Sequence, residues 1–213
     1  MNRFKAAGLS LVFLGVIAVL ISACATTSPR GIVMTVDSIV ARNASSKGKT
    51  YVITSAMQNI SDNDLEFQEV TRYVDNALSS KGYVRTDNKE NADLLICLGY
   101  GICPPVENYQ THTTHGMAMP ISGIWMSTPS KTQTIVITTY VTTLVLEAYD
   151  LKDLNRKSQL WKTTTKLIVH KPDLRSALPF MVAASSDYFG INTEKQINVT
   201  IREDDPRVLN VRK

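Results

Sequence analysis

The chain has 213 residues, of which 44% are hydrophobic, and its 23 basic and 19 acidic side chains give a net charge of +4. Without Arg3 and Lys5, which precede an apolar segment, 21 basic and 19 acidic residues remain, a net charge of +2. So balanced a charge argues against a protein that binds nucleic acid or a strongly anionic partner, while the length suits one domain with a sizeable core.

The first 23 residues have the pattern of a bacterial secretion signal, in which cations precede an apolar run. That run, from Leu9 to Ile21, is shorter than the roughly 20 residues that a spanning helix needs. It ends in the letters ISAC, which resemble the lipobox of bacterial lipoproteins, although lipoboxes favour Leu where Ile21 stands. The resemblance implies cleavage before Cys24 and a covalent lipid on its sulfur. The alternative is a plain N-terminal membrane anchor with an incidental cysteine.

The residue after Cys24 bears on which membrane holds the chain. Ala25 stands where an Asp would resemble an inner-membrane retention signal, so the analogy implies the outer membrane, with the protein facing the periplasm. Residues 24–31 would be a tether, and the seven of them after Cys24 reach roughly 25 Å when extended. Residues 32–213 are expected to form a single domain close to the membrane.

The first elements predicted in the mature chain are two strands and a helix. Residues 32–42 and 49–56 are rich in β-branched residues and flank a Ser-Lys-Gly turn, which predicts a hairpin. A helix follows over 61–82, with Asp62 or Asn63 as its cap and Gly82 as its end, where Tyr83 folds back onto it. Its predicted buried stripe has helical spacing and consists of Phe67, Val70, Val74, Ala77 and Leu78.

The later elements favour an α+β fold. A helix is predicted over 173–190, between a cap at Asp173 and a stop at Gly190, and an antiparallel hairpin is predicted from the β-rich segments on either side of the polar linker at 151–157. We expect a mostly antiparallel sheet with two helices packed on one face and a wet opposite face. The remaining predicted strands are residues 83–85, 92–101, 134–150, 158–170 and 195–203.

Residues 102–131 lack any periodicity and contain Pro104, Pro105, Pro120 and Pro129. They predict a loop of some 30 residues, far longer than an ordinary connection. Loops of this length are usually either functional or disordered.

Four stretches carry a resemblance to a known family, and they are KTYVI at 49–53, LSSKGYV at 78–84, ENADLLICLGYG at 90–101 and TTLVLEAYDLKDLNRKSQLWKTTTK at 142–166. The chain resembles the bacterial envelope lipoproteins known as domain of unknown function 4136, over roughly residues 35–190. It departs from their pattern in the 102–131 loop and beyond Glu203. The resemblance implies an envelope location and this fold. It transfers no catalytic residue, because none is established in the family.

The 102–131 loop holds the best candidate for a metal site. His112, His115, Met117 and Met119 lie within eight residues, and imidazole and thioether are soft enough donors for copper. The alternative is a flexible polar loop with solvated histidines and loosely packed methionines. No zinc signature such as HExxH is present.

Cys97 and Cys103 are candidates for a disulfide, because a pair of thiols outside the cytoplasm can be oxidised. Along a straight strand their α-carbons would be about 20 Å apart, whereas a bridge needs less than about 7 Å. A disulfide therefore requires a sharp turn at Gly99 or Gly101. The alternative is two buried, reduced thiols.

No catalytic motif is found, so we expect a non-catalytic membrane-anchored lipoprotein that is a binding or structural module of the envelope. Such a module would have an envelope protein partner and no cofactor beyond the lipid. Copper binding through the His/Met loop is the alternative, and a hydrolase is a third hypothesis. The three carboxylates of Glu203, Asp204 and Asp205 could meet a cation, but a solvated turn at Asp205-Pro206 explains them more simply.

Overall fold

A single mixed sheet organises the computed structural model, which describes residues 31–213 except 43, 45–47 and 154–157. The predicted signal sequence and Cys24 lie outside the described residues. Residues 31–213 form one compact unit, and in its described part no helix is long and apolar enough to cross a membrane.

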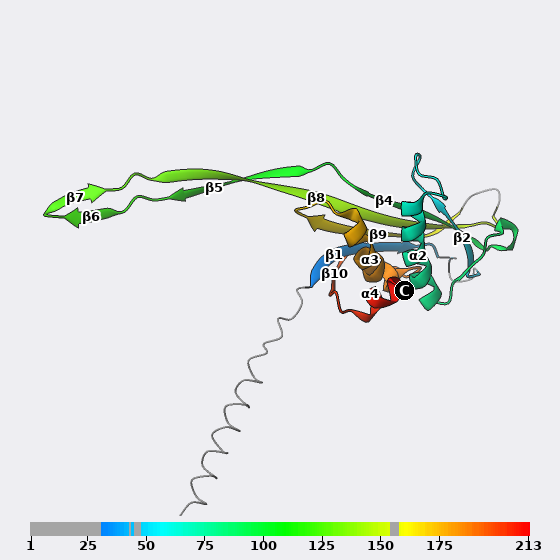
Figure 1. The fold of residues 1–213 in the computed structure, drawn as a ribbon. Coiled ribbons are helices and arrows are strands. Elements are labelled where there is room, and N and C mark those ends of the chain that lie inside the picture. Colours follow the sequence, from blue (N-terminus) through cyan, green and yellow to red (C-terminus); the bar gives the residue numbers. More distant parts are fainter. Residues whose placement is uncertain (1–30, 43, 45–47, 154–157) are drawn as a thin grey trace, which may run out of the picture. The chain divides into compact units, whose positions relative to one another are not determined.

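The sheet runs in the order β10-β1-β9-β8-β4-β2-β3, with β5 paired to the free part of β8 (Figure 1). Only β2 pairs in parallel, with β3 and β4, so the α+β class and the mostly antiparallel sheet are confirmed. The strands are β1 Ile32–Val40, β2 Thr50–Ser55, β3 Val84–Arg85, β4 Leu94–Ile102, β5 Val106–Thr114, β6 Ala118–Ile121, β7 Ile124–Ser127, β8 Lys131–Asp150, β9 Gln159–Val169 and β10 Ile197–Ile201. The helices are α2 Leu65–Ser80, α3 Leu174–Ser185 and α4 Pro206–Val211, with single 3-10 turns η2 Lys89–Asn91 and η3 Ser186–Tyr188.

One of the two predicted hairpins is present and the other is wrong. β8 and β9 pair antiparallel, from Tyr140 opposite Val169 to Tyr149 opposite Gln159. β1 and β2 do not pair, because β1 lies between β9 and β10 while β2 lies between β4 and β3. The strands that pair with β1, namely β9 and β10, come from the far end of the sequence. A turn signal between β1 and β2 cannot predict such distant pairing.

Helix α2 begins one residue later than a cap at Asn63 predicts, and two later than a cap at Asp62, because its cap is Asp64. The Asp64 carboxylate accepts hydrogen bonds from the backbone N–H groups of Glu66 and Phe67. Asp62 instead accepts from the Ser55 backbone at 2.7 Å, which joins the loop to the end of β2. The helix ends as predicted, at Gly82 with a φ of 80° that suits glycine.

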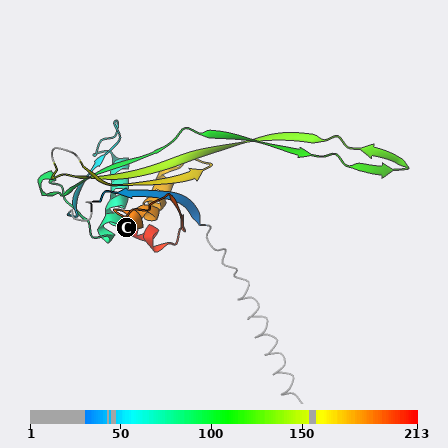
Figure 2. The same ribbon diagram turned by 180° about the vertical axis from the view of Figure 1, so that it is seen from behind.

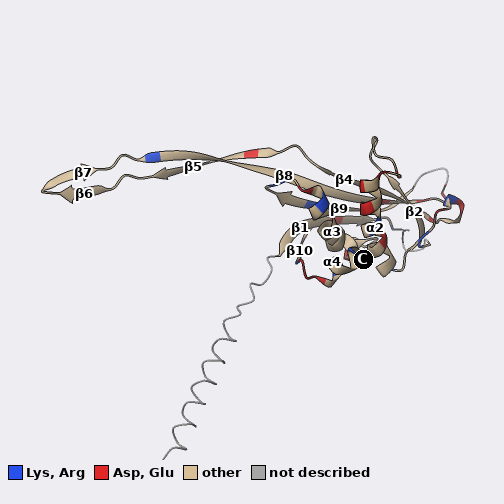
Figure 3. Cartoon of the chain, viewed as in Figure 1, with Lys and Arg blue, Asp and Glu red and all other residues tan. Residues whose placement is uncertain are grey.

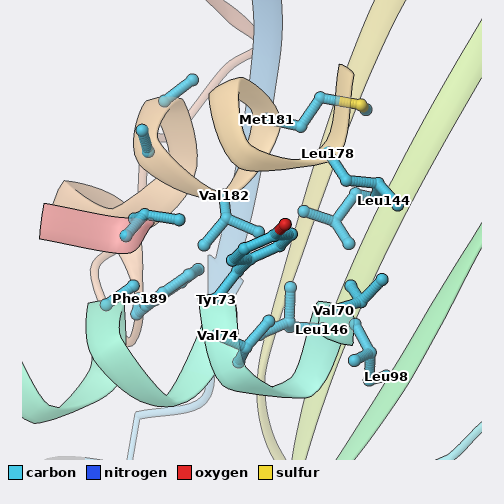
Figure 4. Packing of buried hydrophobic residues seen from close by; sticks show 14 of the residues in the cluster. Val70, Tyr73, Val74, Leu98, Leu144, Leu146, Leu178, Met181, Val182 and Phe189 are labelled. Carbon is cyan, nitrogen blue, oxygen red and sulfur yellow. The ribbon is translucent and has the colours of Figure 1, made fainter. Parts of the chain in front are cut away.

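The core lies between the inward side of the sheet and three helices (Figures 1 and 2). The predicted stripe of α2 is buried, and it belongs to one cluster with the α3 side chains Met181 and Val182 and the β8 side chains Leu144 and Leu146 (Figure 4). The predicted fold had two helices, and α4 is the third. Asp205 caps it and Pro206 is its first residue, where only a turn was predicted.

The opposite face of the sheet is open and mixed, with charged residues on β8 and β9 but also the exposed apolar side chains Val33, Ile39 and Ile168. Along β9, Trp161, Thr163 and Thr165 point into the core, while Lys162 points outward. The Lys162 ammonium lies 2.7 Å from a carboxylate oxygen of Glu147, its cross-strand partner on β8. Alternation of this kind is typical of a strand with one wet face.

Candidate interaction site

The segment predicted as an aperiodic loop forms three strands, β5, β6 and β7. β5 pairs antiparallel with the first half of β8, from Val106 opposite Thr139 to Thr114 opposite Lys131. We call residues 106–139 the ribbon, the two paired segments 106–114 and 131–139 its shaft, and residues 117–128 its tip. Every residue from 102 to 136 is exposed, so this strand formation owes nothing to burial in a core.

A tight turn forms the end of the tip. β6 and β7 are joined by Ser122 and Gly123, whose φ values of 51° and 81° are both positive. This is the two-residue turn whose twist matches paired strands. The sequence contains the signal for this turn, a Ser-Gly pair between Ile121 and Ile124, although no turn was predicted there.

The tip is apolar on both of its faces. Met119 lies opposite Met126 and Ile121 opposite Ile124, so these four share one face. Trp125, which is 72% exposed, lies on the other face. Each large apolar side chain of the tip is more than half exposed, and they are Met117, Met119, Ile121, Ile124, Trp125 and Met126.

Charge is almost absent from the ribbon. No Asp, Glu, Lys or Arg occurs between Glu107 and Lys131, and the next charged residue after Lys131 is Glu147. Figure 3 shows the ribbon tan except at Glu107 and Lys131, whereas the helices and loops of the domain carry many charges. An apolar tip on an uncharged stem is unusual for a surface that faces only water.

The four residues predicted as copper ligands lie at different levels of the ribbon. His112 pairs with Gln133 in β5, while His115 lies beyond the end of that strand, about 10 Å along an extended chain. Met117 and Met119 belong to the tip, where the partner of Met119 is Met126 and not a histidine. Within the residues that the structure describes, no three His, Cys, Asp or Glu side chains gather as a metal group.

No disulfide joins Cys97 to Cys103. β4 continues without a turn through Gly99 and Gly101, and the Cys103 backbone N–H still donates to the Val141 carbonyl at 2.9 Å. Their α-carbons are therefore about 20 Å apart, which is too far for a bridge. The sharp turn that a disulfide requires is not formed.

A cavity of about 370 Å³ lies beside the C-terminal end of α2. Its wall includes Tyr83 and the stacked rings of Trp161 and Phe189, whose centroids are 5.9 Å apart. Burial raises the pKa of Tyr83. The wall of the cavity also contains the ammonium groups of Lys49 and Lys81, and both already have partners. Lys81 lies 2.7 Å from Asp187, and Lys49 donates to the Lys81 carbonyl.

The carboxylates near the C-terminus are held by arginines. Arg202 pairs with Asp204 at 3.0 Å, and Arg207 pairs with both Asp205 and Asp187. The hydrogen bond from Arg207 lowers the pKa of Asp205. Asp204 and Asp205 are thus engaged by arginines, and Asp205 also caps α4, which argues against a cation site and replaces the predicted solvated turn by a helix start.

Comparison with known families agrees with the resemblance noted in the sequence. Residues 37–187, more than half of the chain, match the model of the family described as Domain of unknown function (DUF4136). No curated protein matches the sequence.

Solved structures similar to this chain include three bacterial proteins. A PDZ domain protein from Parabacteroides distasonis is 14% identical with a TM-score of 0.49 and aligns with 84% of this chain, which spans only 41% of that protein. A DUF4136 family protein from Bacteroides thetaiotaomicron is 14% identical over 79% of this chain and 100% of its own, with a TM-score of 0.40. The PelC dodecamer from Paraburkholderia phytofirmans is 12% identical over 74% and 96%, with a TM-score of 0.38.

Proposed function

The chain belongs to the family described as Domain of unknown function (DUF4136), and we propose that it is a lipid-anchored, non-catalytic binding module of the bacterial cell envelope. In this proposal Cys24 holds the chain on the outer membrane, facing the periplasm. The ribbon is the part that contacts another envelope component.

The anchor rests on the sequence around Cys24. A charged start, a short apolar run and the ISAC ending together resemble a lipoprotein signal. A multiply acylated cysteine would hold the chain firmly, because each buried CH₂ contributes about 0.8 kcal/mol and stable anchoring takes more than one chain. Labelled palmitate should be incorporated by the wild type and not by Cys24→Ala. Equal labelling, or identical fractionation of the two proteins, would contradict the anchor.

The binding role rests on one observation, the apolar tip. Six large apolar side chains are exposed there on both faces of a two-stranded ribbon. A large contiguous apolar patch on the surface of a folded protein marks a site that contacts another molecule. Trp125 and the methionines Met119 and Met126 suit a contact surface, because Trp and Met are enriched at interface centres.

In-cell photo-cross-linking tests this role. A photoreactive amino acid at Ile124, which is 69% exposed, should give a recurring adduct with an envelope component, identified by mass spectrometry. The matched control is the same group at Ile168, also 69% exposed but on the open face of the sheet. Adducts no stronger at Ile124 than at Ile168 would refute the binding role.

A second function, copper binding, is favoured only by the side-by-side thioethers of Met119 and Met126. Thioethers are soft donors that select Cu(I). Titration of the full chain with Cu(I) should then show stoichiometric binding that Met119→Leu/Met126→Leu abolishes. His112→Ala/His115→Ala tests the four-residue site predicted from the sequence in the same titration. Binding that neither double variant changes would reject both versions.

A further inference from the structure

The shaft of the ribbon has two open edges. β5 pairs with β8 on one side only, and no described strand lies on its other side. The first half of β8 is equally open on its second side, because β9 pairs with β8 only from Tyr140 onward. Along nine residues of each strand, about 30 Å of chain, every second residue thus presents backbone N–H and C=O groups to an edge without a strand partner, although the Thr138 carbonyl lies 3.4 Å from His170 Nδ1.

These edges lack the features by which proteins prevent edge pairing. Residues 106–114 and 131–139 contain no Pro and no Gly, and their only charges are Glu107 and Lys131. β8 reads TQTIVITT along residues 132–139, a run of high β propensity. Long, uncharged and unpaired edges are the surfaces to which another strand adds.

The two outer edges of the main sheet show that this chain does protect edges elsewhere. β3 has two residues, Val84 and Arg85. β10 has five residues and is followed directly by the charged run at 202–205. Short and charged edges resist pairing, so the open shaft is a local exception within one sheet.

We infer that the shaft pairs with the shafts of neighbouring copies of this chain, β5 of one copy lying against the first half of β8 of the next. The inference rests on the proposed function, because copies anchored in one membrane share a direction. Antiparallel pairing of β5 with β5, or of β8 with β8, would point two domains in opposite directions. Pairing β5 with β8 keeps every tip at the same end and continues the antiparallel order of the ribbon.

Charge also favours this arrangement. With the tips at the same end, Glu107 and Lys131 lie at opposite ends of the shaft, level with Thr138 and Thr114 respectively, so β5-to-β8 contact brings no two charged residues together. Contact between two β5 edges can instead oppose two Glu107 carboxylates, which is unfavourable. Because β5 and β8 are different surfaces, each added copy leaves one open edge of each kind, so the assembly continues until the rotation between copies closes it, or extends as an open array.

Disulfide trapping between two differently tagged full-length copies tests the pairing. Both copies carry Cys97→Ser and Cys103→Ser. One has Tyr109→Cys, and the other has a single Cys at successive positions along residues 132–138. We expect a disulfide between the two tagged copies that peaks at one position and recurs at every second residue, as strand pairing requires. The control pair Ile39→Cys and Ile168→Cys, exposed on the open face, should give none.

The mass of the full chain in detergent, measured by light scattering, gives a second test. Wild type should be a multiple of the 23.6 kDa chain, less its cleaved signal, and Val136→Lys should reduce it to a single copy. Ile168→Lys is the matched control. A monomeric wild type, or no trapped disulfide at any position, would overturn the inference. If Ile124 still gives an adduct with another protein, the binding role survives that failure.

Discussion

Removing the ribbon should leave the domain folded, and the register of β5 and β8 defines how to remove it. Glu107 lies directly opposite Thr138. Replacing residues 108–137 by Asn-Gly therefore joins two cross-strand neighbours through a two-residue turn of the kind that hairpins favour. The change deletes 30 residues and keeps the whole of β8 that pairs with β4 and β9.

The expected change in the free energy of unfolding is small. Of the deleted residues only Ile137 is even half-buried, and losing that burial costs about 1 kcal/mol at most. Shortening the connection from 30 residues to two is about four halvings, each worth about 0.6 kcal/mol in loop entropy, so the gain is at most about 2 kcal/mol. We expect a net change between a loss of about 1 and a gain of about 2 kcal/mol.

Urea unfolding followed by tryptophan fluorescence measures this change. Trp161 is 3% exposed and stacks on Phe189, so its emission reports on the core. The chain's other tryptophan, Trp125, is in the ribbon, so Trp125→Phe is the matched parent for the deletion. A loss of more than about 3 kcal/mol would refute the reasoning, because it would require core contacts that the ribbon does not make.

Three further predictions concern the domain itself. Met181→Ala, at a fully buried site of α3, should lower the free energy of unfolding by about 2–5 kcal/mol in urea unfolding. Tyr51→Phe removes the hydroxyl that donates to Asp75 at 2.6 Å and should cost about 1–2 kcal/mol in the same assay. The hydrogen bond from Lys81 lowers the pKa of Asp187, so its contribution is present above about pH 4 and is lost as the pH falls through the lowered value. Asp187→Asn should therefore reduce the acid loss of stability, by less than about 1 kcal/mol because the side chain is 44% exposed.

The elements that the sequence predicted correctly are those that bury one side against the hydrophobic core. The stripe of α2 and the alternation of β9 are each set by burial on one side, so the spacing of apolar residues is enough to find them. The helix end at Gly82 also depends only on nearby residues. It requires a positive φ at Gly82 and hydrogen bonds from the Gly82 and Tyr83 N–H groups to carbonyls in the last turn of α2. Asp205 and Pro206 were also local signals for α4, but its six residues are too few to show a stripe.

The elements that were missed depend on pairing rather than burial. β5, β6 and β7 are exposed on both faces, so no alternation of polar and apolar residues marks them, whereas β8 was predicted from residue 134 onward by its β-branched residues. Thr111 faces Thr134 and Thr113 faces Thr132, pairs that are stabilised across the ribbon and are invisible in either strand alone. The neighbours of β1 are likewise set by strands more than 100 residues away.

The origin of the ribbon within the sheet explains how a two-stranded structure can serve as a binding element. An isolated two-stranded hairpin is only marginally stable in water. One strand of this ribbon, however, is the first half of β8, whose other half lies in the middle of the sheet with Leu144, Leu146 and Ala148 buried on its inner side. The backbone of the central strand is therefore already extended where the ribbon begins, and less conformational entropy remains to be lost when a partner orders the rest. A long flexible loop with the same apolar residues would lose that entropy in full, so it would bind the same partner more weakly.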